Sequence, residues 1–451
     1  MKKQQFTNKQ LFTLIWPLVI EQGLAILVGM ADTVMVSSAG EAAISGVSLV
    51  DMINNLVFTV FAGLATGGAV VTSQAIGAND DDRVKRSVGQ LVNLAALIGF
   101  GVMFFCLAVR RPMLRMFFGS ISDDVMAACM LYFSITLLSY PFLALYNSGG
   151  AIFRSLGNSA VSMKVSIAMN LINFLGNAIC IYGLKMGVAG VALPTALSRI
   201  FGAITILYLA GKINGPARIT LKSVLSFDSL MARKILTIGT PSAFENSIFQ
   251  LGRVLVVSMI SAFGTVHISA NAVANSLDGI GCIFGQAISL AMITVVGQCV
   301  GAMDIAAAKS YTKKLLAIAY VTMAITNGLI LIFLNQLLNL FSLSPETNRL
   351  SWILVMIHAG FAIFMWPASF VLPNALRAAN DVQFTMITSI ASMIIWRISF
   401  SLVLCSHMGL GAIGVWIAMI IDWICRITCF VWRFNWLFAK SDRILPKAHG
   451  A

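Results

Sequence analysis

Long runs of apolar residues, separated by short polar connections, fill this chain from residue 11 to residue 436. Each run is about 20 residues long or longer, the length that an α-helix needs to cross the hydrocarbon core of a bilayer. We count twelve such runs, and they predict twelve membrane-spanning helices. The predicted spans are 11–36, 46–76, 88–110, 124–148, 159–183, 187–210, 234–262, 270–298, 312–340, 348–376, 383–405 and 410–436.

The composition supports an all-α polytopic membrane protein. Of the 451 residues, 59% are hydrophobic and 10% are charged, and the mean hydropathy is +0.89. A soluble domain carries about a quarter charged residues, so the sequence leaves no room for a sizeable soluble domain. The basic N-terminus "MKKQQFTNKQ" precedes an apolar segment that is too long for a signal-peptide core, and we expect an uncleaved first span.

The positive charges are distributed unevenly between the two sides of the membrane. If the spans alternate in direction, 21 Lys and Arg residues in the connections fall on the side of the N-terminus and five on the other side. Basic residues favour the cytoplasmic side, so both termini are predicted to be cytoplasmic and the protein to lie in the inner membrane. The net charge of +13 is dispersed over short loops beside anionic lipid, and we expect no nucleic-acid partner.

The chain contains an internal repeat. The one long connection, 211–233, is basic and contains a Gly-Pro pair; it separates an N-terminal lobe (1–210) from a C-terminal lobe (234–451), and we interpret it as a cytoplasmic linker. At a constant offset of 224 residues, polar and special residues of the two halves coincide without a gap. The matched pairs include Pro17 and Pro241, Glu21 and Glu245, Gly40 and Gly264, Gln74 and Gln298, Gly77 and Gly301, and Asp80 and Asp304.

Because each half contains an even number of spans, the two halves have the same orientation in the membrane. The repeat is therefore parallel, as in transporters that place a cavity between two helix bundles. Two pseudo-symmetric six-helix lobes and a transport function are the predictions that follow from the repeat.

Acidic residues occur inside the first and seventh spans. A charge near the bilayer centre costs roughly 2.5 to 3.5 kcal/mol on insertion scales, so it is expected to face protein or water and to have a role. Glu21 and Asp32 are eleven residues apart and lie within roughly 20° on one helix face. Glu21 and its repeat counterpart Glu245 follow prolines, Pro17 and Pro241, which we predict to be helix hinges.

Asp32 has candidate partners in the fifth and sixth spans. Asn173 and Asn177 are one helical turn apart, and Thr195 follows a proline. A carboxylate with amide and hydroxyl oxygens offers hard donors to a small cation, and protonation would neutralise the carboxylate equally well. We predict a site for Na⁺ or H⁺ here, with Asp32 as a possible Na⁺ ligand. Asn side chains also serve as polar contacts between membrane helices, and that alternative stays open.

Further ionisable residues lie in other spans. Asp51 and Asp278 are candidate partners of Arg253, and we assign Asp51, Arg253 and His358 to a substrate cavity together with Glu21 and Glu245. His358 could be a structural histidine or a proton relay. Asp422 and Arg426 are four residues apart and are expected to pair as structural contacts, with Arg397 nearby.

Several other kinds of site are disfavoured. The segment "NDDDRVKR" at 79–86 is Asp-rich like the Mg²⁺ motifs of membrane prenyltransferases, but no second such segment occurs and a solvated turn explains it. The sequence has no phosphate-binding GxxxxGK[ST] loop, and its eight cysteines are scattered through apolar segments without metal-ligand spacing. We expect neither an enzyme nor a cofactor.

Six segments carry a resemblance over the whole chain. They are "ADTVMV", "VVTSQAIGAND", "FRSLGNS", "PSAFE", "VVGQCVGAMD" and "LRAANDV". Because the six segments occur together and in this order, the chain resembles the multidrug and toxic compound extrusion (MATE) family. The resemblance implies a V-shaped pair of six-helix lobes that rock between inward-open and outward-open states and export organic, often cationic, compounds in exchange for H⁺ or Na⁺. We expect a monomer.

Carried over by position, Asp32, Asn173, Asn177 and Thr195 resemble the family's N-lobe cation site, and Glu245 its C-lobe acid. Ala362 and Trp366 stand where some members have a Tyr and an Asp, which moves the expected coupling site to the N-lobe. The alternatives are a lipid-linked saccharide flippase of the same superfamily, an intramembrane enzyme such as a prenyltransferase, and a channel.

Overall fold

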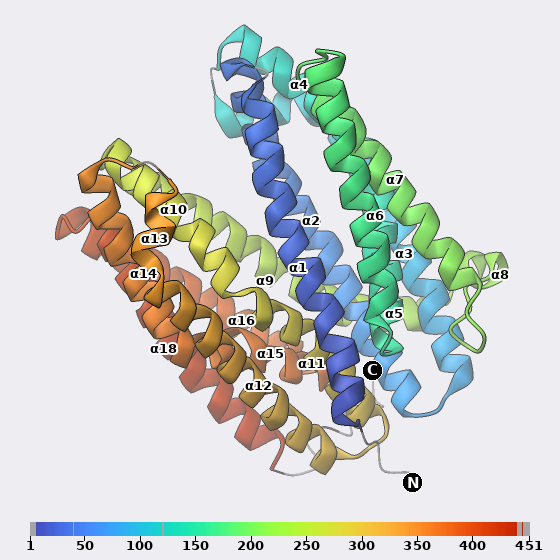
Figure 1. The fold of residues 1–451 in the computed structure, drawn as a ribbon. Coiled ribbons are helices and arrows are strands. Elements are labelled where there is room, and N and C mark those ends of the chain that lie inside the picture. Colours follow the sequence, from blue (N-terminus) through green and yellow to red (C-terminus); the bar gives the residue numbers. More distant parts are fainter. Residues whose placement is uncertain (1–5, 39, 120, 342, 440–443, 445–451) are drawn as a thin grey trace. The chain divides into compact units, whose positions relative to one another are not determined.

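The computed structural model describes residues 6–38, 40–119, 121–341, 343–439 and 444, and all regular structure among them is helical (Figure 1). The helices of the first half are α1 (Asn8–Ser37), α2 (Glu41–Gly77), α3 (Asp81–Phe118), α4 (Asp123–Leu137), α5 (Tyr140–Ser155), α6 (Ser159–Ala178), the π-helical η1 (Ile179–Gly183), α7 (Ala189–Gly211) and α8 (Leu221–Leu225). Those of the second half are α9 (Ser229–Ser261), α10 (Thr265–Gly281), α11 (Ile283–Gly301), α12 (Ile305–Ile332), α13 (Leu334–Asn339), α14 (Pro345–Trp366), η2 (Pro367–Val371), α15 (Leu372–Ala378), α16 (Val382–Ser392), η3 (Met393–Ile398), α17 (Ser399–Ser401), η4 (Leu402–His407) and α18 (Ala412–Leu437).

The helices match the predicted spans, with three irregular cases. Within the described residues, ten helices are long and apolar enough to cross a membrane, or eleven if α4 and α5, bent by 47° at their junction, form one span. The seventh predicted span is α9, whose polar residues keep it out of that set. The eighth is divided between α10 and α11 at Cys282. With α9 included, the twelve predicted crossings are accounted for.

The chain forms two compact units whose boundaries fall inside helices. One unit comprises Phe12–Ala243; the other comprises the chain from Phe244 onward together with the N-terminal residues up to Leu11. We call them the N-terminal and C-terminal units. Leu11 and Phe12 lie in α1, and Ala243 and Phe244 lie in α9. The two helices with the predicted hinge prolines, Pro17 and Pro241, therefore each contribute residues to both units.

The backbone preserves the 224-residue repeat. Gly40 and Gly264 precede α2 and α10, with φ of 104° and 93°. Asp80 and Asp304 cap α3 and α12, and each accepts a hydrogen bond at 2.9 Å from the backbone N–H three residues later. An acid at this position satisfies a free N–H at the helix start. The repeated turns therefore place equivalent helices at equivalent points of the two units.

The segment 211–233 is docked on α3. Asn93 donates to the carbonyl oxygen of Val224 at 2.8 Å, and Gln90 donates to that of Ser226. The approach is close at Gly89, where a Cβ atom would lie 2.3 Å from the carbonyl oxygen of Ser223. Only glycine allows this contact without a shift of the backbone.

We predict that Gly89→Ala destabilises the protein by about 1 to 3 kcal/mol, because the new methyl group would clash with backbone that cannot move freely. Gly101→Ala in the same helix is the matched control, since a Cβ there meets nothing within 4 Å and alanine favours helix by up to about 1 kcal/mol. Thermal unfolding in detergent measures both. Equal midpoints for Gly89→Ala and the unsubstituted protein would contradict the docking.

Candidate functional site

The predicted cation site is assembled inside the N-terminal unit by α1, α6 and α7. Gly176 on α6 lies against Pro194 on α7, where a Cβ atom on the glycine would be 2.7 Å from that of the proline. This close approach brings Asn173 beside Thr195, with 3.0 Å between the amide and the hydroxyl oxygen. Asn177, one turn further along α6, donates to Asp32 Oδ1 at 2.8 Å. All four predicted residues therefore meet.

The Asn173 amide can present either of its atoms to Asp32. With its nitrogen toward the carboxylate, the N–O distances are 3.1 and 3.3 Å and the amide oxygen faces Thr195. In the opposite orientation the nitrogen donates to Thr195 and the oxygen accepts from Asn177 at 3.3 Å. An ionised carboxylate without a cation favours the first orientation because it needs donors. A bound cation favours the second, which turns an oxygen inward.

A second polar cluster lies on α2, α4 and α5 in the same unit. Asp51 accepts from Asn54 at 3.0 Å and from Tyr132 at 3.1 Å, and Tyr140 donates to Asn54 at 2.7 Å. Arg199 on α7 acts electrostatically on both Asp32 and Asp51. Sequence reasoning missed Arg199, although an arginine inside the apolar sixth span was a signal for it.

Glu21 and Glu245 occupy equivalent positions but have different surroundings. Glu21 accepts from Ser162 at 3.1 Å in the N-terminal unit. Glu245 is 4% exposed; it lies 2.7 Å from Arg377 and 3.8 Å from Arg426, and it accepts from Ser389 at 2.5 Å. The expected ion pair of Arg426 with Asp422 is not formed among the described residues. Arg426 instead pairs with Glu245, while Asp422 accepts from Ser392 and acts on Arg426 electrostatically.

The C-terminal unit also encloses a cavity of about 290 Å³. Arg253 and His358, both predicted to line a substrate cavity, lie in its wall. So does Trp366. The wall is otherwise formed largely by aromatic side chains and by polar residues of α10 and α14, with Arg397 from η3.

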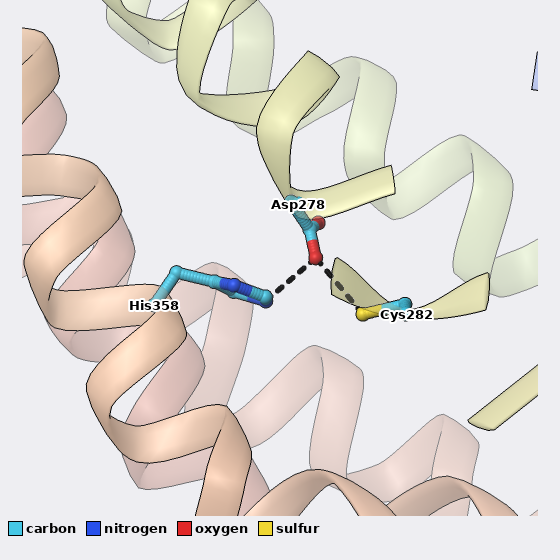
Figure 2. A group of neighbouring side chains, drawn as sticks. All are labelled: Asp278, Cys282 and His358. Carbon is cyan, nitrogen blue, oxygen red and sulfur yellow. Dashed lines mark hydrogen bonds and ion pairs between the residues drawn. The ribbon is translucent and has the colours of Figure 1, made fainter. Parts of the chain in front are cut away.

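Figure 2 shows three side chains that converge at this cavity. His358 Nε2 lies 2.8 Å from Asp278 Oδ1, and Cys282 Sγ lies 3.1 Å from the same oxygen. Their donor atoms lie within 4.8 Å of one another, and they are of the types that bind zinc. Two arginines line the same cavity and oppose a cation. We therefore interpret the group as an aspartate whose charge is met by His358 and Cys282.

Comparison with known proteins decides the family. The model of the family described as MatE matches residues 17–179 and 241–403, two ranges that are themselves 224 residues apart. The chain belongs to the MatE family. It is 30% identical to the uncharacterized transporter YisQ of Bacillus subtilis (strain 168), with 96% of each chain covered. It is 26% identical to the probable multidrug resistance protein NorM of Thermotoga maritima, over 93% of this chain and 90% of that one.

The fold of this MATE protein is likewise that of solved transporters. A multidrug resistance MATE family transporter of the MOP superfamily, solved in an outward-facing conformation, superposes with a TM-score of 0.89 at 21% identity, covering 98% of this chain and all of the other. The predicted class of twelve helices in two lobes is thus confirmed, and the protein is a multi-pass membrane protein of a transporter family.

We predict that Glu245→Gln lowers stability by about 3 to 5 kcal/mol, because it leaves buried guanidinium groups without their anion. Glu346→Gln, at the exposed start of α14, is the control and should change stability by less than about 1 kcal/mol. Thermal unfolding of the purified variants measures the difference. If Glu245→Gln unfolds at the same temperature as the control, the ion pairs of Glu245 with the arginines do not stabilise the protein, and the prediction is wrong. The double variant Glu245→Gln/Arg377→Gln should recover part of the loss.

Proposed function

We propose that this MATE protein is a secondary-active antiporter that exports organic, drug-like compounds in exchange for H⁺ or Na⁺. The observation that carries the proposal is the polar group around Asp32, which lies among apolar helices and has no acid at the repeat-equivalent position, Val256. The names of relatives as multidrug resistance proteins support the export of organic compounds. We also propose that the protein is a monomer in the inner membrane and that both of its termini lie on the cytoplasmic side.

In the proposed mechanism, Asp32 takes up the coupling cation. Binding of the cation removes the net charge of the carboxylate, and the amides of Asn173 and Asn177 then rotate to present oxygen instead of nitrogen. The Oδ1 atom of Asn177 is buried without a hydrogen-bond partner, and it is available as such a ligand. The membrane potential supplies about 2.3 kcal/mol per charge per 100 mV, so inward movement of a cation can drive export.

The proline-containing helices supply the movement in this proposal. Pro17 lies in α1 and Pro241 in α9, and each deprives its helix of a backbone hydrogen bond. Both helices contribute residues to both compact units. We propose that α1 and α9 bend at these prolines when the Asp32 site changes its charge, and that substrate is released outward.

The charge of the exported compound depends on which acids are available to it. Glu21 and Asp51 in the N-terminal unit support a cationic compound. Glu245 was expected to do the same, but its contacts with Arg377 and Arg426 compensate its charge. Any preference for cations therefore rests on the N-terminal unit.

Replacement of Asp32 by Asn is predicted to abolish ion-driven efflux of a fluorescent cation from reconstituted vesicles, because the neutral amide neither titrates nor attracts Na⁺. Asp124→Asn, at the exposed start of α4, is the matched control and should transport at the normal rate. The H⁺ gradient and the Na⁺ gradient are imposed separately. Efflux by Asp32→Asn at the control rate under either gradient would sink the mechanism.

Thr195→Val separates the two coupling ions. Valine keeps the shape of threonine but removes an oxygen that a metal ion would use. If Na⁺ is the coupling ion, we expect the Na⁺ concentration for half-maximal efflux to rise at least tenfold. If H⁺ is the coupling ion, proton-driven efflux should change by less than threefold, since Asp32 alone carries the proton. A tenfold loss under the proton gradient would contradict this assignment.

A further inference from the structure

Two arginines line the cavity of the C-terminal unit without an ion-pair partner among the described residues. Arg397, on η3, is 9% exposed, and its Nε atom is buried without a hydrogen bond. Its guanidinium carbon lies over the ring of Phe249, 5.5 Å from the ring centroid. Arg253, from α9, is exposed and lines the same cavity. A buried charge is costly unless it is paired. Asp422 and Asp278 act on Arg397 electrostatically, but among the described residues neither forms an ion pair with it, so a guanidinium group in the cavity wall has no anion in direct contact.

The acids near Arg397 are already engaged with other groups. Asp278 is met by His358 and Cys282, as Figure 2 shows. Asp422 accepts a hydrogen bond from Ser392. The third acid of this interior, Glu245, is held by Arg377 and Arg426. Of these three acids only Asp278 lines the cavity, together with two arginines, so the charge of the cavity wall is predominantly positive.

The rest of the wall is suited to a flat ring system. Trp366 and Phe370 are stacked with their ring centroids 5.0 Å apart, and Trp416 and Trp423 complete an aromatic surface. A volume of about 290 Å³ is just below the range for pockets that hold drug-sized ligands, roughly 300 to 1,000 Å³. A molecule the size of a two-ring aromatic acid is appropriate to this space.

We propose that this cavity binds an aromatic organic anion, with its carboxylate between Arg397 and Arg253 and its rings on the tryptophans. Guanidinium groups match carboxylates in geometry and charge. The proposal rests on the export function proposed above, because it names a class of compound that the transporter would accept. It adds that the C-terminal unit selects for negative charge, whereas the acids of the N-terminal unit select for positive charge.

The test measures binding of three probes of similar shape to the purified full chain in detergent: 1-naphthoate, the neutral 1-naphthamide and the cationic 1-naphthylmethylammonium. Quenching of tryptophan fluorescence and calorimetry give the dissociation constants. We expect 1-naphthoate to bind at least tenfold more tightly than either of the other two. Equal binding of the acid and the amide, or tightest binding of the ammonium compound, would overturn the proposal.

Three variants locate the site. Arg397→Gln should weaken binding of 1-naphthoate at least tenfold and change that of 1-naphthamide less than twofold. Arg349→Gln, an exposed arginine at the start of α14 in the same unit, is the matched control and should leave both unchanged. If Arg397→Gln does not fold, Arg253→Gln takes its place with an expected loss of at least threefold. An unchanged affinity for 1-naphthoate in a folded variant would refute the assignment.

Efflux of a fluorescent cation, measured on the same preparations, separates this proposal from the antiport mechanism. Arginine-dependent binding of 1-naphthoate by a protein that drives no efflux would support the anion site and refute the export function. Normal ion-driven efflux with no arginine-dependent binding would refute the anion site alone.

Discussion

A charged side chain placed among apolar helices is stable only where a partner of suitable chemistry meets it, and this requirement organises both units. In the N-terminal unit the partners are mostly neutral donors: amides for Asp32, and an amide and a phenol for Asp51. In the C-terminal unit Glu245 is met mainly by arginines. Neutral donors leave a carboxylate free to exchange a proton or a cation, whereas contact with two arginines keeps it occupied.

The repeat makes the difference between the units easy to trace. Asp51 and Asn54 on α2 correspond at the offset of 224 to Asn275 and Asp278 on α10, so the acid and the amide have exchanged places. Asn54 accepts from Tyr140 and donates to Asp51. Asp278 instead accepts from Cys282 and lies beside His358. One backbone framework has thus acquired two different polar interiors.

The sequence predicted the helices well because apolar runs and short polar turns are local signals. The fifth span was expected at 159–183, and α6 with η1 covers those residues. The Asp32 group was also predictable, since few polar side chains occur in these spans. The contact of Arg377 with Glu245 was not, because it depends on which turns of α15 and α9 meet, and the positive-inside pattern had placed Arg377 with the loops. The cavity beside Arg397 depends on side-chain packing from several helices, for which the sequence has no local signal.

The exchange of charge between the halves has a consequence for selectivity. Arg253 in the C-terminal unit corresponds to Gly29 in the N-terminal unit, and Trp423 corresponds to Arg199. Each unit thus has an arginine at a position where the other unit has an uncharged residue. A ligand that follows equivalent surfaces of the two units therefore meets positive charge at different positions. An internal arginine such as Arg199 also competes with any cation for Asp32 and Asp51, because it already supplies part of the positive charge that those carboxylates require. In the coupling mechanism that we propose, an incoming cation would have to displace the influence of this guanidinium group, which Ser139 and Phe58 hold in place. In that proposal, a fixed positive charge near the site weakens cation binding and so assists release of the coupling ion where its concentration is low.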